Sequence, residues 1–132
     1  MPKILGMGAA LPATRVSNEE LSTKLGRPAA DIETLSGVRV RYYAAAGEGP
    51  SDLARAAAVT ALEEAHATPA DLEFLIFATM TPDVTFPGSG CYLQEKLGCG
   101  TIGALDLRAQ CGGFLFALDV ADQFLRAGAY RR

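Results

Sequence analysis

Residues 74–78, Phe-Leu-Ile-Phe-Ala, form an apolar run in which no polar residue alternates with the apolar ones. A strand of this composition is typical of a parallel sheet that has helices on both faces, because both sides of such a strand are buried. Segments with strand and helix patterns follow one another along the rest of the chain, which is typical of α/β layers. The sequence therefore predicts an α/β fold around a mainly parallel sheet.

The helix and strand boundaries follow from periodicity and capping residues. Ser17 and Glu20 have the spacing of a capping box, Ser51 is predicted to cap a second helix, and Gly98 and Gly128 are predicted to end two others. The short run that begins at Ile4 is interpreted as a strand followed by a turn. We predict helices at about 18–25, 29–36, 52–66, 87–97 and 111–127, and further strands at about 38–43, 72–79 and 103–107.

Length and charge exclude several classes of protein. The 132 residues are enough for a single domain, 1–132, and the net charge is −3, with the twelve Lys and Arg residues scattered along the chain. A nucleic-acid interface would need those basic residues on one face. No apolar run approaches the roughly 18–20 residues of a membrane span, and residues 1–5 lack the pattern of a signal peptide. We therefore expect a soluble, cytoplasmic protein without nucleic-acid or membrane partners.

Metal and cofactor sites are not predicted. Cys91, Cys99 and Cys111 are odd in number and spaced like neither a disulfide framework nor a zinc site, and His66 is the only histidine. His66 falls at the end of a predicted helix, where a histidine interacts favourably with the helix dipole. We interpret the cysteines as free thiols in a reducing compartment.

Gly6 and Gly8 match the start of a dinucleotide-binding fingerprint, but the third glycine is missing and Pro12 stands where a helix should open. A strand that needs close backbone approach explains these glycines better. A Rossmann-like binding domain is therefore the weakest alternative, and no cofactor is predicted.

The segment around Cys111 is the best candidate site. A predicted strand runs through a sharp turn into a helix whose first residue is Cys111. The free amide groups and the positive end of a helix N-terminus favour a thiolate. Gly112 and Gly113 leave room for a substrate carbonyl, and the Cys111 amide can donate into an oxyanion hole. These residue types also fit a buried structural cysteine with glycines for tight packing, so both interpretations stay open at this point.

Several segments, in the same order, resemble the amino-terminal part of β-ketoacyl-acyl-carrier-protein synthase III, a family of the thiolase superfamily. The resemblance spans essentially the whole chain, and the order and spacing of the motifs make it specific. The matching segments are 6–12, 36–39, 78–83, 86–87, 97–98, 106–114 and 117–128.

The resemblance implies a thiolase-like layered fold with a buried nucleophile helix, of which this chain is the incomplete N-terminal half. It implies that Cys111 is the catalytic nucleophile, which accepts an acyl group from a thioester before condensation with a malonyl thioester. It also implies that Phe86 reaches across a homodimer interface toward the partner's acyl pocket. The family's catalytic histidine and asparagine lie in a second half that this sequence lacks, so we expect the chain alone to be catalytically incomplete.

The sequence departs from the family pattern at the residues that hold coenzyme A. The family has a tryptophan and an arginine where this chain has Asp31 and Leu35, and Gln110 replaces a small residue beside the nucleophile. The donors implied are carrier-protein or coenzyme A thioesters, and the departures favour the carrier protein. We expect the missing half to be supplied by the rest of the chain or by another chain, because Arg131 and Arg132 follow a helix where a strand should come next.

Three alternative functions remain at this stage. Two are related enzymes, a hydroxymethylglutaryl-coenzyme A synthase-like enzyme and a polyketide starter-unit acyltransferase. The third is a non-catalytic dimerisation subunit. Loss of the cysteine would have favoured that alternative, but Cys111 is present.

Overall fold

The structure is a computed structural model that describes residues 1–131. The chain divides into two compact units, one made of Met1–Ala10 with Gly49–Arg132 and the other of Leu11–Glu48. Each unit is described by itself below.

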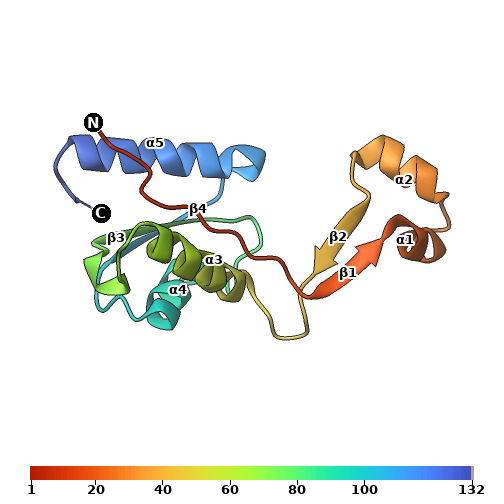
Figure 1. The fold of residues 1–132 in the computed structure, drawn as a ribbon, viewed down its shortest axis with the longest axis horizontal. Coiled ribbons are helices and arrows are strands. Elements are labelled where there is room, and N and C mark those ends of the chain that lie inside the picture. The colour runs from red at the N-terminus through yellow and green to blue at the C-terminus, as the bar shows by residue number, and fades with distance from the viewer. Residues whose placement is uncertain (132) are drawn as a thin grey trace. The chain divides into compact units, whose positions relative to one another are not determined.

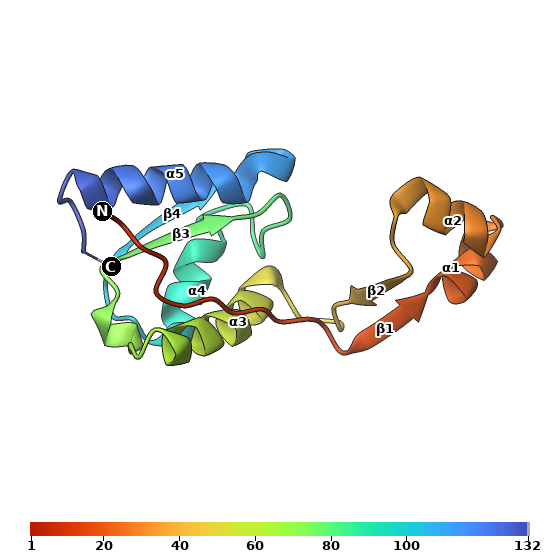
Figure 2. The same ribbon diagram turned by 45° about the horizontal axis from the view of Figure 1, so that its top comes forward.

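The larger unit has a layered α/β arrangement. Helix α5 (Gly113–Arg126) lies on one face of the pair of strands β3 (Phe74–Ala78) and β4 (Gly103–Leu107), and α4 (Ser89–Leu97) lies on the other face, with α3 (Pro50–Glu64) packed against α4 (Figures 1 and 2). The strands are parallel, with Phe74 opposite Gly103 and Ala78 opposite Leu107. The α/β fold class is confirmed, while the sheets of the described chain are small, with two strands each.

Helix α3 begins two residues earlier than predicted. Its N-cap is Gly49, whose amide donates to the Asp52 carboxylate over 2.9 Å, and Ser51 lies inside the first turn with no exposed surface. The prediction that Ser51 caps this helix was therefore wrong. Proline is favoured at the first position of a helix. Pro50 occupies that position here, so the helix starts at Pro50.

Helix α4 ends as predicted, at Gly98 in the left-handed conformation (φ 73°). Its start is Ser89 rather than residue 87, since residues 79–88 form a loop that includes a cis peptide bond between Phe86 and Pro87. Two 3-10 turns complete the unit, Pro69–Asp71 and Gln110–Gly112.

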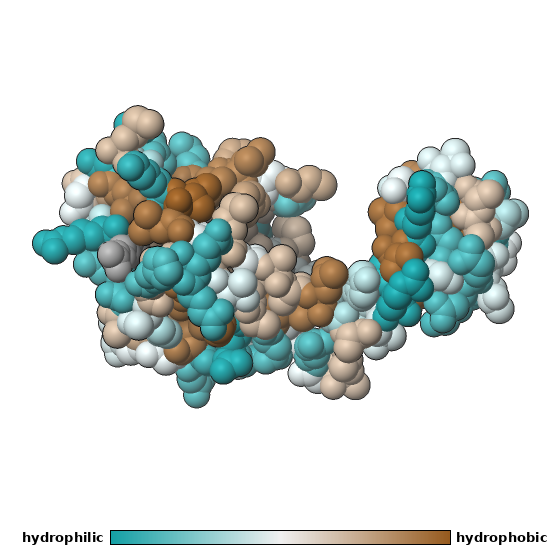
Figure 3. Space-filling model, viewed as in Figure 1, coloured by the Kyte–Doolittle hydropathy of each residue, from teal (hydrophilic) through white to brown (hydrophobic). Residues whose placement is uncertain are grey.

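The core lies between α4 and the strands, where Phe77, Leu93 and Cys99 are buried. Helix α5 contacts β3 on one face, and its other faces are open, with Phe114 and Leu115 each 69% exposed. Figure 3 shows apolar surface over α5. Helix α5 is apolar on most of its circumference, so it is expected to be covered on more than one side. Within the described residues the pair of strands covers only one side, and this expectation is not met.

The predicted strand at Ile4 is absent. Residues 1–10 run in extended form along α3, and the Met7 amide donates to the Glu64 side chain over 2.6 Å. A Cβ atom on Gly6 or Gly8 would stand about 2 Å from a backbone oxygen of Ala61 or Ala57. The glycines therefore allow the close backbone approach that was predicted for them, but no strand lies beside the segment to form a ladder within the described residues.

The smaller unit pairs β1 (Thr14–Ser17) with β2 (Val40–Tyr43) in antiparallel register and adds the helices α1 (Asn18–Leu25) and α2 (Ala29–Ser36). Both helices and the Ser17–Glu20 capping box are confirmed. The predicted strand 38–43 is two residues shorter. Strand β1 was not predicted, because Thr-Arg-Val-Ser is too short and polar to show a period.

None of the described helices is both long and apolar enough to cross a membrane.

Candidate functional site

Cys111 lies in the turn between β4 and α5, with its side chain exposed and its thiol unpaired with any other cysteine. The α-helix was predicted to begin at Cys111, and this start was wrong, because the α-helix begins at Gly113 and Cys111 belongs to the preceding 3-10 turn. The reason is the backbone of the preceding residue. Gln110 has φ +44°, outside the right-handed helical region, and the Gly112 amide bonds to the Ala109 carbonyl three residues back, as in a 3-10 turn.

The turn that carries Cys111 is held by hydrogen bonds on both sides. The Gln110 amide donates to the Met80 Sδ over 3.4 Å, and the Gly112 amide donates to the Ala109 carbonyl over 3.0 Å. A left-handed glutamine is unusual, and backbone strain of this kind is often found at functional sites. A hydrogen bond to a loop residue 30 positions away in sequence therefore helps to hold the turn that carries Cys111.

The two glycines after Cys111 have different environments. A Cβ on Gly112 would press against the Phe116 ring at 3.0 Å, while one on Gly113 would make ordinary contact with Ala78 at 3.6 Å. A side chain at Gly112 would therefore have to push the exposed Phe116 ring aside, whereas Gly113 has room for a Cβ.

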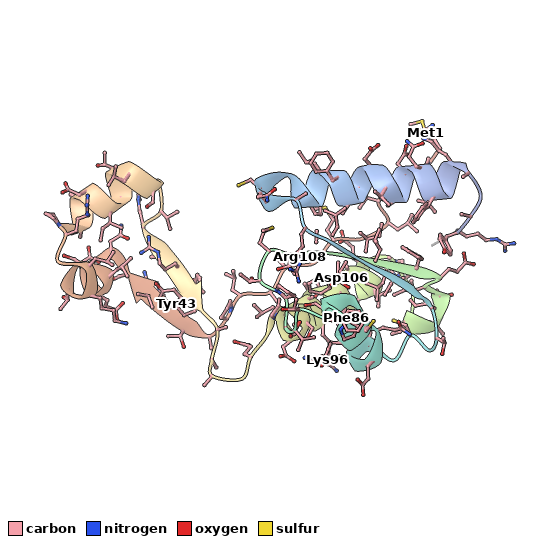
Figure 4. The ribbon with its side chains drawn as sticks, turned by 180° about the vertical axis from the view of Figure 1, so that it is seen from behind. Met1, Tyr43, Phe86, Lys96, Asp106 and Arg108 are labelled. Atoms are coloured by element: carbon pink, nitrogen blue, oxygen red, sulfur yellow. The ribbon has the colours of Figure 1, made fainter. Side chains whose placement is uncertain are left out.

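Phe86 lies in the loop of residues 79–88 and is 89% exposed. Figure 4 shows Phe86 beside α4. The side chain is free to contact another molecule.

Asp83 anchors this loop. Its carboxylate accepts from the Ser51 hydroxyl over 2.8 Å and from the Ser51 amide over 3.2 Å, and its own amide donates to the Ser89 hydroxyl over 2.9 Å. Ser51 and Ser89 are fully buried. Burial acts to raise the pKa of Asp83, but hydrogen bonds with Ser89 and Ser51 outweigh it and hold the pKa below its ordinary value.

Asp106 of β4 caps α4 from outside the helix. Its carboxylate accepts from the amide of Ser89 over 2.7 Å and from that of Gly90 over 3.1 Å. Gly88, at φ +118°, leaves the space that this carboxylate occupies, because a Cβ there would stand 2.6 Å from the carboxylate carbon. Free amides at a helix start favour a negative charge, and here Asp106 supplies it.

A salt bridge completes this polar cluster. The Lys96 Nζ donates to the Ser51 hydroxyl over 2.7 Å and to the Asp52 carboxylate over 2.5 Å. The hydrogen bond from Lys96, followed by the one from the Gly49 amide, lowers the pKa of Asp52. Lys96 therefore joins the end of α4 to the start of α3.

The residues that depart from the coenzyme A pattern lie elsewhere. Asp31 and Leu35 are both exposed on α2, in the smaller unit.

His66 lies just after α3 instead of within it, with φ +50°. Within residues 1–131, no group of three or more metal-ligating side chains comes together.

Sequence reasoning did not find Met80, Asp83 and Asp106 as site residues. Each acts on a residue at least 16 positions away, so no local spacing indicates the contact. The only available signal was negative. The N-cap residue of α4 is Gly88, which has no side chain that could cap the helix. This leaves the amides at the start of α4 for a cap from another segment.

Comparisons with known proteins show which family this chain resembles in sequence. The chain is 46% identical over 129 residues to a β-ketoacyl-[acyl-carrier-protein] synthase III of Thiobacillus denitrificans and 42% identical over 126 residues to one of Xylella fastidiosa. Each match covers 96% of this chain and 40% or 39% of the relative. Residues 105–132, which contain Cys111, match the family model 3-oxoacyl-[acyl-carrier-protein (ACP)] synthase III.

The chain is homologous to the amino-terminal part of β-ketoacyl-[acyl-carrier-protein] synthase III. It spans about 40% of the length of the relatives that it matches. The resemblance predicted from the sequence motifs is thereby confirmed.

Solved structures of a synthase III and of a priming β-ketosynthase have a similar fold. The enzyme of Aquifex aeolicus VF5 superposes with a TM-score of 0.89 at 37% identity, over 96% of this chain and 41% of that one. The priming β-ketosynthase of the R1128 polyketide pathway superposes with a TM-score of 0.92 at 34% identity, over 98% of this chain and 39% of that one. The described fold therefore matches the N-terminal part of the thiolase-like fold of synthase III.

Proposed function

We propose that the intact protein carrying residues 1–132 is an acyltransferase of the β-ketoacyl-acyl-carrier-protein synthase III type, with Cys111 as its nucleophile. The observation that carries this proposal is the exposed thiol of Cys111 in a turn between β4 and α5, inside the segment that matches the family model.

The other two cysteines are poorer nucleophiles. Cys99 is buried, and desolvation raises the pKa of its thiol. Cys91 is exposed in the first turn of α4, where the amides of Ser89 and Gly90 already bind the Asp106 carboxylate and are not available to a substrate carbonyl oxygen. No side chain caps α5 in the described chain, so no carboxylate occupies the turn of Cys111 in this way.

The proposed reaction has two steps. The Cys111 sulfur attacks the carbonyl carbon of an acyl thioester, a new carbon–sulfur bond forms, and the donor thiol leaves. A malonyl thioester then loses CO₂, and the resulting carbanion attacks the acyl carbon and releases the Cys111 thiolate. The histidine and asparagine that stabilise the enolate in this family would come from the part of the relatives that the chain does not span.

Phe86 is proposed to bind substrate. It is almost fully exposed, and in a homodimer it would reach the acyl pocket of the partner protomer. The proposed partners are acyl and malonyl thioesters, with the carrier protein favoured over coenzyme A as donor because Asp31 and Leu35 stand where the coenzyme A ligands would be.

The test is acylation followed by intact-protein mass spectrometry. The intact protein is incubated with an acyl thioester, and one acyl adduct per chain is expected on wild type and on the matched control Cys91→Ala, but none on Cys111→Ala. An adduct that persists in Cys111→Ala would disprove the assignment of the nucleophile.

A polyketide starter-unit enzyme is a second candidate, and the similarity to the R1128 priming ketosynthase favours it. A hydroxymethylglutaryl-coenzyme A synthase-like reaction differs in that no CO₂ is released. The release of labelled CO₂ from a malonyl thioester therefore distinguishes the decarboxylating enzymes from that alternative.

A further inference from the structure

The loop of residues 79–88 joins β3 to α4 and carries Phe86. Because Phe86 is 89% exposed, packing within the described chain does little to fix its ring. The position of an exposed side chain is then decided by the backbone beneath it. The contacts that hold this loop therefore determine where Phe86 is presented.

The first part of the loop is tied to the strand and to the turn of Cys111. The Thr79 amide donates to the Leu107 carbonyl over 3.2 Å, which extends the ladder of β3 and β4 by one bond. Met80 accepts the hydrogen bond from the Gln110 amide. The beginning of the loop is thus fixed relative to Cys111.

The middle of the loop is tied to buried groups through Asp83, three residues before Phe86. The carboxylate takes both the amide and the hydroxyl of Ser51, and the Asp83 amide binds the Ser89 hydroxyl. Hydrogen bonds to an ionised acceptor are about twice as strong as neutral ones. Ser51 and Ser89 have no exposed surface, so water does not replace these bonds readily.

Asp106 contacts the far end of the loop. Its carboxylate accepts a hydrogen bond from the Ser89 amide and leaves room only for a glycine at position 88. Phe86 therefore lies between two anchors that both rest on buried partners. Of the two, Asp83 belongs to the loop itself and lies three residues before Phe86.

We propose that Asp83 is a positioning residue that holds the loop of residues 79–88 and thereby presents Phe86 to the acyl chain. The proposal rests on the proposed function, because Phe86 acts there on the acyl substrate. Asp83 does not touch the substrate and acts through Phe86.

The loop is tested by hydrogen–deuterium exchange of the intact protein, in a peptide that covers residues 79–88. Exchange is expected to be about tenfold faster in Asp83→Ala than in wild type, with Asp83→Asn in between because its amide oxygen still accepts one bond. Glu33→Gln is the matched control, since the Glu33 carboxylate accepts a hydrogen bond from Arg39 in the smaller unit and has no bond to the loop. Unchanged exchange in Asp83→Ala would overturn the proposal.

The action through Phe86 is tested by a double-mutant cycle. The rates of acylation by the acetyl and octanoyl thioesters of N-acetylcysteamine are measured for wild type, Asp83→Ala, Phe86→Ala and the double variant. We expect each single variant to change the octanoyl-to-acetyl ratio of kcat/KM by about fivefold in the same direction, and the double variant to match Phe86→Ala. Changes that multiply in the double variant would overturn the proposal.

Failure of the proposed function has a different signature. If the wild type forms no acyl adduct with either thioester, the proposed function and the role of Phe86 fall together. The exchange measurement then still decides whether Asp83 holds the loop, since it does not depend on acylation.

Discussion

The carboxylate of Asp106, near the carboxyl end of β4, accepts a hydrogen bond from the backbone amide of Ser89, the first residue of α4, over 2.7 Å. A strand side chain thus supplies the N-terminal cap of a helix that has no cap of its own. Cys111 follows Asp106 by five residues along the chain. The packing that fixes α4 is therefore built from the strand that positions the candidate nucleophile.

Replacement of Asp106 is expected to destabilise the intact protein. Asp106→Ala removes an ionised acceptor from the amides of Ser89 and Gly90, and the loss of bonds to a charged group should lower the free energy of unfolding by about 2 kcal/mol. Urea unfolding measures this change. Asp119→Ala, at an exposed position of α5, is the control, and equal stability of the two variants would contradict the capping role.

The three thiols are expected to differ in reactivity under native conditions. Cys111 is exposed in a turn that no side chain caps, Cys91 is exposed beside amides that bind the Asp106 carboxylate, and Cys99 is buried with a raised pKa. Limiting iodoacetamide followed by peptide mapping should therefore modify Cys111 first and Cys99 last. Equal labelling of all three in the folded protein would count against the assignment of Cys111, and labelling in urea provides the control for intrinsic reactivity.

The contribution of Asp83 to stability is expected to depend on pH. Because its pKa in the folded protein is below its ordinary value of about 3.9, the unfolded chain binds more protons at acidic pH. The stabilisation is fully present above that ordinary value and is lost as the pH falls through the folded pKa. The difference in free energy of unfolding between wild type and Asp83→Asn should be constant from about pH 7 to 5 and shrink below about pH 4.

Urea unfolding at several pH values measures this difference. A difference that grows as the solution is acidified would have the wrong sign and would contradict the hydrogen-bonded, ionised state of Asp83.

The intact protein is expected to prefer carrier-protein donors. Asp31 and Leu35 lie exposed on α2, where an acidic and an apolar side chain offer little to the nucleotide of coenzyme A. Binding energy far from the reacting carbonyl helps to position it, so a carrier-protein thioester should give the higher kcat/KM. Acylation rates with the same acyl group on each donor test this, with Cys111→Ala as the blank. Equal or better transfer from acyl-coenzyme A would refute the preference and leave the homology untouched.

Local patterns in the sequence determined most of the elements and the candidate nucleophile. The apolar run 74–78 predicted a parallel strand, Ser17 and Glu20 predicted a helix start, and the order of motifs around Cys111 indicated the family. These features depend on neighbours a few residues apart, where hydrogen bonds and side-chain periodicity are decided by the chain itself.

The tertiary structure alone decided how the site is held together. Strand β1 exists because β2 pairs with it, and the segment at Ile4 is not a strand because no partner lies beside it within the described residues. The anchors Met80, Asp83 and Asp106 join groups that are 16 to 32 residues apart. Contacts across such distances leave no period in the sequence, since the folded layers and not the chain bring these residues together.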